Sequence, residues 1–101
     1  MRRRAKVDAN QSTIVSALRS AGVFVQPLHM VGRGVPDLLA IRRGVVYLLE
    51  VKDGAKAASA RKLTTDESAW HAAAYSHGYT VAVVDGIDSA LAAVGLGVKK
   101  L

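Results

Sequence analysis

The chain has 101 residues, and half of them are hydrophobic, which suffices for one domain with a single buried core but not for two. It contains no cysteine, which excludes a disulfide framework and a thiolate zinc site, and its apolar runs are far shorter than the ~20 residues that cross a bilayer. The formal charge of +6 comes from 14 basic and 8 acidic residues, and six of the basic ones lie near the two ends: Arg2, Arg3, Arg4, Lys6, Lys99 and Lys100.

The remaining eight basic residues balance the eight acidic ones. The sequence therefore predicts one formally neutral domain within residues 1–101, with basic tails at 1–6 and 99–101. Polar residues follow the N-terminal arginines at the place where a signal peptide would be apolar. We therefore expect a cytoplasmic protein that contacts no membrane.

The first half of the chain predicts one helix and three strands. Asp8 and Gln11 have the spacing of a capping box, and apolar residues then recur at helical spacing, which predicts a helix over residues 9–21. Residues 23–28 predict a short strand, which precedes a loop with two glycines. Residues 37–42 and 45–52 are apolar runs of strand length, and they predict a hairpin with a two-residue turn.

The second half predicts two helices and a further strand. Residues 55–62 predict a basic loop, and Thr64 with Glu67 forms a second capping box for a helix that ends at Gly78. Residues 79–84 predict a buried strand, and residues 88–94 a short C-terminal helix. This order predicts an α/β fold in which helices flank a mixed sheet.

Two carboxylates face each other across the predicted hairpin. If Arg42 pairs with Val45, then Asp37 lies opposite Glu50, with Cβ atoms about 4.5 to 5.5 Å apart. Like charges at that distance are destabilising unless a cation neutralises them. Lys52 shares the face of Glu50 because side chains alternate along a strand. Oxygen ligands of this kind suit Mg²⁺ or Mn²⁺, which also bind phosphate oxygens, so we expect a phosphate-bearing substrate.

The same residues resemble a nuclease signature. Val35-Pro36-Asp37, followed after twelve residues by Glu50-Val51-Lys52, resembles the PD-(D/E)XK motif. More narrowly, residues 34–38, 50–54 and 63–70 resemble the VRR-NUC family, especially its short stand-alone members from phages and bacteria. The likeness covers residues 8–84 and implies a restriction-endonuclease-like αβββαβ core.

The resemblance also implies an activity and the residues that perform it. It implies a metal-dependent DNA endonuclease that hydrolyses phosphodiester bonds in branched or structured DNA, such as four-way junctions, and that acts as a homodimer in a bacterial host cell. Asp37, Glu50 and the Val51 carbonyl would bind Mg²⁺ or Mn²⁺. Lys52 would position the attacking water or help to deprotonate it. Gln11 stands where the family often has a further polar residue, and it would hold a metal-bound water.

Other interpretations of these residues stay open. Asp37, Glu50 and Lys52 could form an ordinary ion-pair cluster on a solvated strand face. Gln11 and Glu67 could serve only as helix caps, and Glu67 departs from the glutamine that the family has at this position. The chain could also be a non-catalytic nucleic-acid-binding module on the same fold, or a structural protein.

Basic residues outside the carboxylate pair predict contacts with the phosphates of DNA. Arg33, between two glycines just before the proline-aspartate pair, is the strongest single candidate. The predicted DNA-binding residues are Arg2, Arg3, Arg4, Arg33, Lys56, Arg61 and Lys62.

The aromatic and histidine side chains predict structural roles. Tyr47, Tyr79 and Trp70 are expected in the core or in an interface, because only five aromatic residues serve the whole chain. His71 and His77 lie near a helix end, where a charged His77 would interact favourably with the helix dipole. We expect neither histidine to bind a metal, and we expect His29 at the surface.

Overall fold

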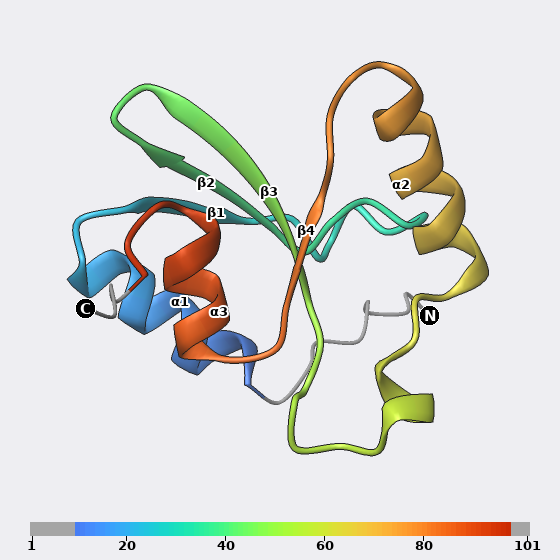
Figure 1. Ribbon diagram of the computed structural model, residues 1–101, viewed down its shortest axis with the longest axis horizontal. Coiled ribbons are helices and arrows are strands. Elements are labelled where there is room, and N and C mark those ends of the chain that lie inside the picture. Colours follow the sequence, from blue (N-terminus) through green and yellow to red (C-terminus); the bar gives the residue numbers. More distant parts are fainter. Residues whose placement is uncertain (1–9, 98–101) are drawn as a thin grey trace.

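The chain folds around one four-stranded sheet (Figure 1), in a computed structural model that describes residues 10–97. The predicted order of helices and strands is confirmed, and a 3₁₀ turn, η1, is added within the segment that was expected to be a loop. The basic tails lie outside the described residues. The elements are α1 (Gln11–Ser20), β1 (Phe24–Pro27), β2 (Leu38–Arg42), β3 (Val45–Val51), η1 (Ala58–Arg61), α2 (Thr65–Ser76), β4 (Ala82–Val84) and α3 (Ile87–Ala93).

The sheet is mixed, with the strand order β1-β2-β3-β4. The first three strands are antiparallel, and β4 runs parallel to β3. Arg42 pairs with Val45 in the predicted register. Arg43 and Gly44 both have positive φ angles, 51° and 78°, as a type I′ turn requires. This tight turn fixes which residues of β2 and β3 lie opposite each other.

The hydrophobic core lies between the sheet and the two helices α1 and α3, which pack together on one side of it (Figure 1). Leu49 and Val51 on β3 are buried in this core, with at most 1% of their surface exposed. Because side chains alternate along a strand, Glu50 points to the opposite face. Figure 1 shows α2 beyond β3 and β4 from the other two helices, so Glu50 faces α2.

The helix α2 stands apart from the core. None of its residues is buried, and Tyr75 is 71% exposed. The predicted capping box begins the helix: Thr64 Oγ1 accepts from Glu67 N at 3.1 Å, and Glu67 Oε1 accepts from Thr64 N at 2.9 Å. Side-chain contacts from α2 to β3 and to the residue that follows it therefore position this helix, since it has no buried apolar face.

Two sequence expectations about these elements are wrong. Gln11 is the first residue of α1, directly after the N-cap residue Asn10, so it cannot be the third helical residue of a capping box. The last strand is shorter than residues 79–84, and Val83 is 50% exposed. The physical reason is that β4 is an edge strand, with a neighbour on one side only.

Between residues 10 and 97, none of the helices combines the length and the apolar character that a membrane crossing requires.

Candidate active site

Asp37 lies immediately before β2, and backbone contacts hold it in place. Its carbonyl oxygen accepts a hydrogen bond from Leu28 N at 2.7 Å, and its side-chain Oδ2 accepts one from Val51 N at 2.8 Å. The β2–β3 register, extended by one pair, brings the Asp37 and Glu50 side chains to the same face, and their carboxyl groups interact directly. The structure therefore brings together the two carboxylates that the sequence predicts to face each other.

Glu50 is a fully buried carboxyl group. Its side chain is 0% exposed, Oε1 lies 3.0 Å from His71 Nε2, and Oε2 has no hydrogen-bond partner. Burial is the largest cause that raises the pKa of Glu50 from 4.5 to about 9, and the hydrogen bond and charge of Asp37 contribute to the same rise. A buried pair of carboxyl groups of this kind destabilises the folded protein unless a cation compensates the charge.

Lys52 supplies an ammonium group beside this pair. Its Nζ lies 2.8 Å from Glu67 Oε1, and the two side chains are only 11% and 18% exposed. Burial alone would raise the pKa of Glu67, but hydrogen bonds from Lys52 and from the Thr64 backbone hold that pKa below its ordinary value. Glu67 therefore both caps α2 and contacts Lys52 at the site.

His71 is the site residue that the sequence analysis missed. Burial lowers the pKa of His71, so its ring is neutral at pH 7 and forms a hydrogen bond with Glu50 in place of an ion pair. The available signal was its spacing of four residues from Glu67, which puts both on one face of α2. His77 does lie at the helix end, where its Nδ1 is 2.9 Å from the Ala73 carbonyl oxygen.

We refer to Asp37, Glu50, Lys52, Glu67 and His71 as the five-residue cluster. Within residues 10–97, no three acidic or histidine side chains gather closely enough to hold a metal ion by themselves. The donor set nevertheless fits Mg²⁺ or Mn²⁺, because Glu50 Oε2 is buried without a partner and two carboxyl groups share one place. These ions keep water and phosphate oxygens among their ligands, so two carboxylates and a backbone carbonyl suffice on the protein side.

Gln11 lies at the end of α1 that is tied to the cluster. Asn10 Nδ2, on the preceding residue, donates to the carbonyl oxygens of Lys52 at 3.0 Å and Asp85 at 3.2 Å. Gln11 itself is only 4% exposed, and its Oε1 is buried with no hydrogen-bond partner. The capping interpretation of Gln11 is therefore wrong, and its amide has no structural role that the contacts explain.

The predicted phosphate contacts differ in their surroundings. Arg33, Lys56 and Lys62 are exposed, and Arg33 has a φ of 56° in the loop before Asp37. Arg61 is half-buried at the end of η1, and its guanidinium lies 3.9 Å from Asp85 Oδ2. The predicted contacts at Arg2, Arg3 and Arg4 lie outside the described residues.

Two of the tyrosines have structural contacts. Tyr47 packs against the hydrophobic core, and the Tyr79 hydroxyl accepts a hydrogen bond from Leu48 N at 2.6 Å. Trp70 is half-buried on α2.

Gly34 fixes the loop of Arg33 against α2. Its φ is 82°, and a Cβ there would collide with the Asp66 carbonyl group and lie 2.9 Å from Glu67 N. We expect Gly34→Ala to lower the free energy of unfolding by about 2 kcal/mol or more, because it adds a steric collision to backbone strain. Gly32→Ala is the matched control, since its φ is 73° but a Cβ there would meet nothing within 4 Å. Urea denaturation that showed equal losses for both variants would contradict this close packing.

Comparison with known proteins gives one structural match. A solved structure described as a VRR_NUC domain is 29% identical in sequence to this chain and superposes on it with a TM-score of 0.61. The match covers 79% of this chain and 84% of the other. No protein-family model and no curated protein matches the chain. The match confirms the predicted fold class and the predicted family resemblance.

Proposed function

Because this chain belongs to the VRR-NUC family of nuclease-type domains, we propose that it is a Mg²⁺- or Mn²⁺-dependent DNA endonuclease. One observation carries the proposal: a fully buried glutamate with an unpartnered oxygen contacts an aspartate, next to a lysine whose ammonium is held in place. This arrangement is costly in a protein that only needs to fold. A divalent cation and a phosphate would compensate its charges.

The residues of the cluster take distinct roles in this proposal. Asp37, Glu50 and the Val51 carbonyl hold the cation, which when bound lowers the pKa of water and polarises the phosphate. Lys52 positions the attacking water and offsets negative charge on the phosphate, while Glu67 holds its ammonium at 2.8 Å. His71 keeps the Glu50 carboxylate oriented through its 3.0 Å contact. Gln11 completes the site as a neutral hydrogen-bonding group.

The proposal extends to the DNA-binding surface. Arg33, Lys56, Arg61 and Lys62 contact the phosphates on either side of the cleaved bond, together with the N-terminal arginines. Support comes from sequence position, because Arg33 precedes Asp37 by four residues and Lys56 follows Lys52 by four. Contacts of this kind carry no base specificity, and binding weakens steeply with salt.

We also propose that the protein forms a homodimer and that it cleaves branched DNA, such as four-way junctions, in the cytoplasm. One small domain covers little DNA, and a two-fold axis would relate two sites for paired cuts.

Light scattering measures the molar mass in solution and so tests the dimer. Incubation with linear, single-stranded, flap and four-way-junction DNA in Mg²⁺, Mn²⁺ or EDTA tests the cleavage activity. We expect metal-dependent products, most abundant with the junction. Binding without products on every DNA would favour the non-catalytic module.

The charge at the cluster predicts how DNA binds without metal. In EDTA, Asp37→Asn is expected to bind DNA about threefold to tenfold more tightly than the parent at low salt, because one negative charge beside the phosphate is gone. Asp88→Asn is the matched control, as Asp88 is exposed in the first turn of α3. Fluorescence anisotropy with labelled DNA measures both. Equal affinities of the parent and Asp37→Asn would argue against a phosphate at the cluster.

A further inference from the structure

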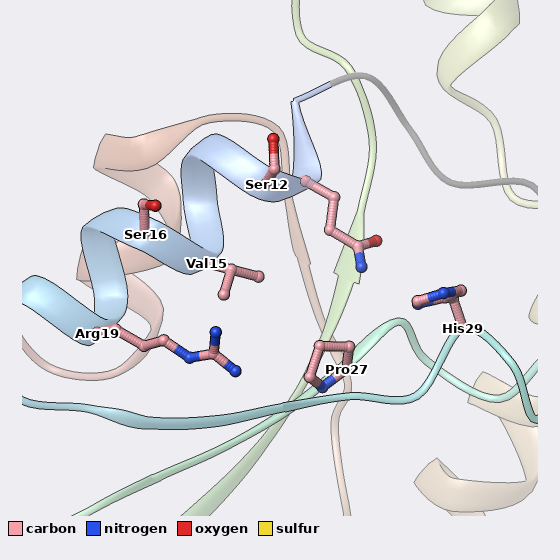
Figure 2. A pocket seen from close by; sticks show the side chains of 7 residues that line it. Ser12, Val15, Ser16, Arg19, Pro27 and His29 are labelled. Carbon is pink, nitrogen blue, oxygen red and sulfur yellow. The ribbon is translucent and has the colours of Figure 1, made fainter.

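A pocket of about 390 Å³ lies between α1 and the chain at the end of β1 and just after it. Figure 2 shows Val15 on α1 above Pro27, with Arg19 at one end of the pocket and His29 at the other. The volume is in the range of natural small-molecule sites. Two apolar side chains thus form opposing walls, and polar groups stand at the ends.

Polar atoms in this lining lack partners. Gln11 lines the pocket, is 96% buried and has no partner for its Oε1, and His29 Nδ1 is also buried without one. Buried polar atoms in folded proteins are nearly always hydrogen-bonded, and an unsatisfied one costs stability. Whichever way its amide is turned, Gln11 offers one donor side and one acceptor side. The pocket is therefore built for a ligand with hydrogen-bonding atoms along its edge.

Two hydrogen bonds connect the chain segments of the pocket with the backbone of the five-residue cluster. Gln11 follows Asn10, whose side chain donates to the Lys52 carbonyl oxygen at 3.0 Å. His29 follows Leu28, whose backbone N donates to the Asp37 carbonyl oxygen at 2.7 Å. We therefore expect a ligand in the pocket to lie near a phosphate that the cluster binds.

We propose that this pocket takes one unpaired nucleobase of the bound DNA, adjacent to the phosphate at the cluster. A nucleobase is flat and apolar on its faces, which suits Val15 and Pro27, and its polar edge would meet Gln11 and His29. A base within a duplex cannot enter, whereas a base that is already unpaired pays the least to leave the stack. The proposal rests on the proposed function in one respect, since it takes DNA as the polymer at the cluster.

Binding measured without metal tests this base pocket directly. Two labelled duplexes are compared by anisotropy in EDTA: one has a single bulged adenosine, and the other has an abasic residue at the same place. We expect the parent to bind the first about tenfold more tightly, because a base that enters the pocket removes apolar surface from water. Equal affinities for the two duplexes would overturn the proposal.

Two variants on α1 test whether the preference for the duplex with the bulged base depends on the pocket. Ser16 lines the pocket, and we expect Ser16→Trp to fill it and to bind both duplexes with equal affinity. Thr13→Trp is the matched control, because Thr13 is exposed on the same helix and does not line the pocket. It should keep the tenfold preference. A preference that survived in Ser16→Trp, with circular dichroism showing both variants folded, would overturn the proposal.

Two further measurements distinguish binding of a base in the pocket from binding of a free nucleotide and from cleavage. Chemical-shift changes on adding deoxyadenosine monophosphate, and none with deoxyribose 5-phosphate, are expected at the pocket, so that free nucleotide and DNA are tested apart. Cleavage in Mn²⁺ without any base preference would remove the pocket proposal and leave the nuclease standing. A base preference without cleavage would leave the pocket proposal standing and remove the nuclease.

Discussion

Replacing Lys52 with alanine is expected to lower the rate of DNA cleavage by about 100- to 1,000-fold, the usual loss when a group that stabilises transition-state charge is removed. Its side chain is 11% exposed and its ammonium is held 2.8 Å from Glu67 Oε1, so water cannot easily replace it. The measurement is the single-turnover rate at saturating DNA, which separates the chemical step from binding.

Lys56→Ala is the matched control for Lys52→Ala. Lys56 is exposed, four residues further along the chain, and is proposed only as a phosphate contact. We expect it to weaken DNA binding and to leave the saturated rate within about threefold of the parent. Circular dichroism verifies that both variants fold. Equal rates for Lys52→Ala and the parent would remove Lys52 from the site.

Glu50→Gln is expected to stabilise the metal-free protein at pH 8 by on the order of 2 to 4 kcal/mol. The pKa of Glu50 is raised from 4.5 to about 9, so the stability that this group contributes is complete below pH 4.5 and is lost as the pH rises toward 9. Glutamine keeps the shape and a partner for His71, and it has no proton that the unfolded chain releases above pH 4.5. Parent and variant are therefore expected to converge near pH 4.5 and to diverge at higher pH.

Urea denaturation at pH 5 and pH 8 in EDTA measures this difference. Asp88→Asn is again the control, and its free energy of unfolding is expected to equal that of the parent at both pH values. Adding Mn²⁺ at pH 8 is expected to stabilise the parent and not Glu50→Gln, because binding to the folded state alone raises stability. A parent that is as stable as Glu50→Gln at pH 8 without metal would contradict the buried-charge interpretation.

The hairpin was predictable from the sequence because its information is local. A two-residue turn at Arg43-Gly44 leaves one register for β2 and β3, and that register determines that Asp37 faces Glu50. The second capping box was predictable for the same reason, since its two residues are three apart.

The contacts of α2 with the site were not predictable in the same way. None of its residues is buried, so no apolar face indicates where the helix packs. Its position depends on side-chain contacts across 15 and 21 residues of chain, from Glu67 to Lys52 and from His71 to Glu50. Gln11 was misread because a spacing of three residues fits both a cap and a buried group at the helix start.

The appearance of DNA product as the Mn²⁺ concentration rises, followed for the parent and for Asp37→Asn, tests most directly whether this carboxylate pair works as a metal-dependent nuclease. We expect the parent to give no product in EDTA and a saturating rise with Mn²⁺. We expect Asp37→Asn to give less than about 1% of that rate at every concentration, since it lacks one of two carboxylate ligands. Cleavage by the parent in EDTA, or equal cleavage by the variant, would contradict the proposed active site.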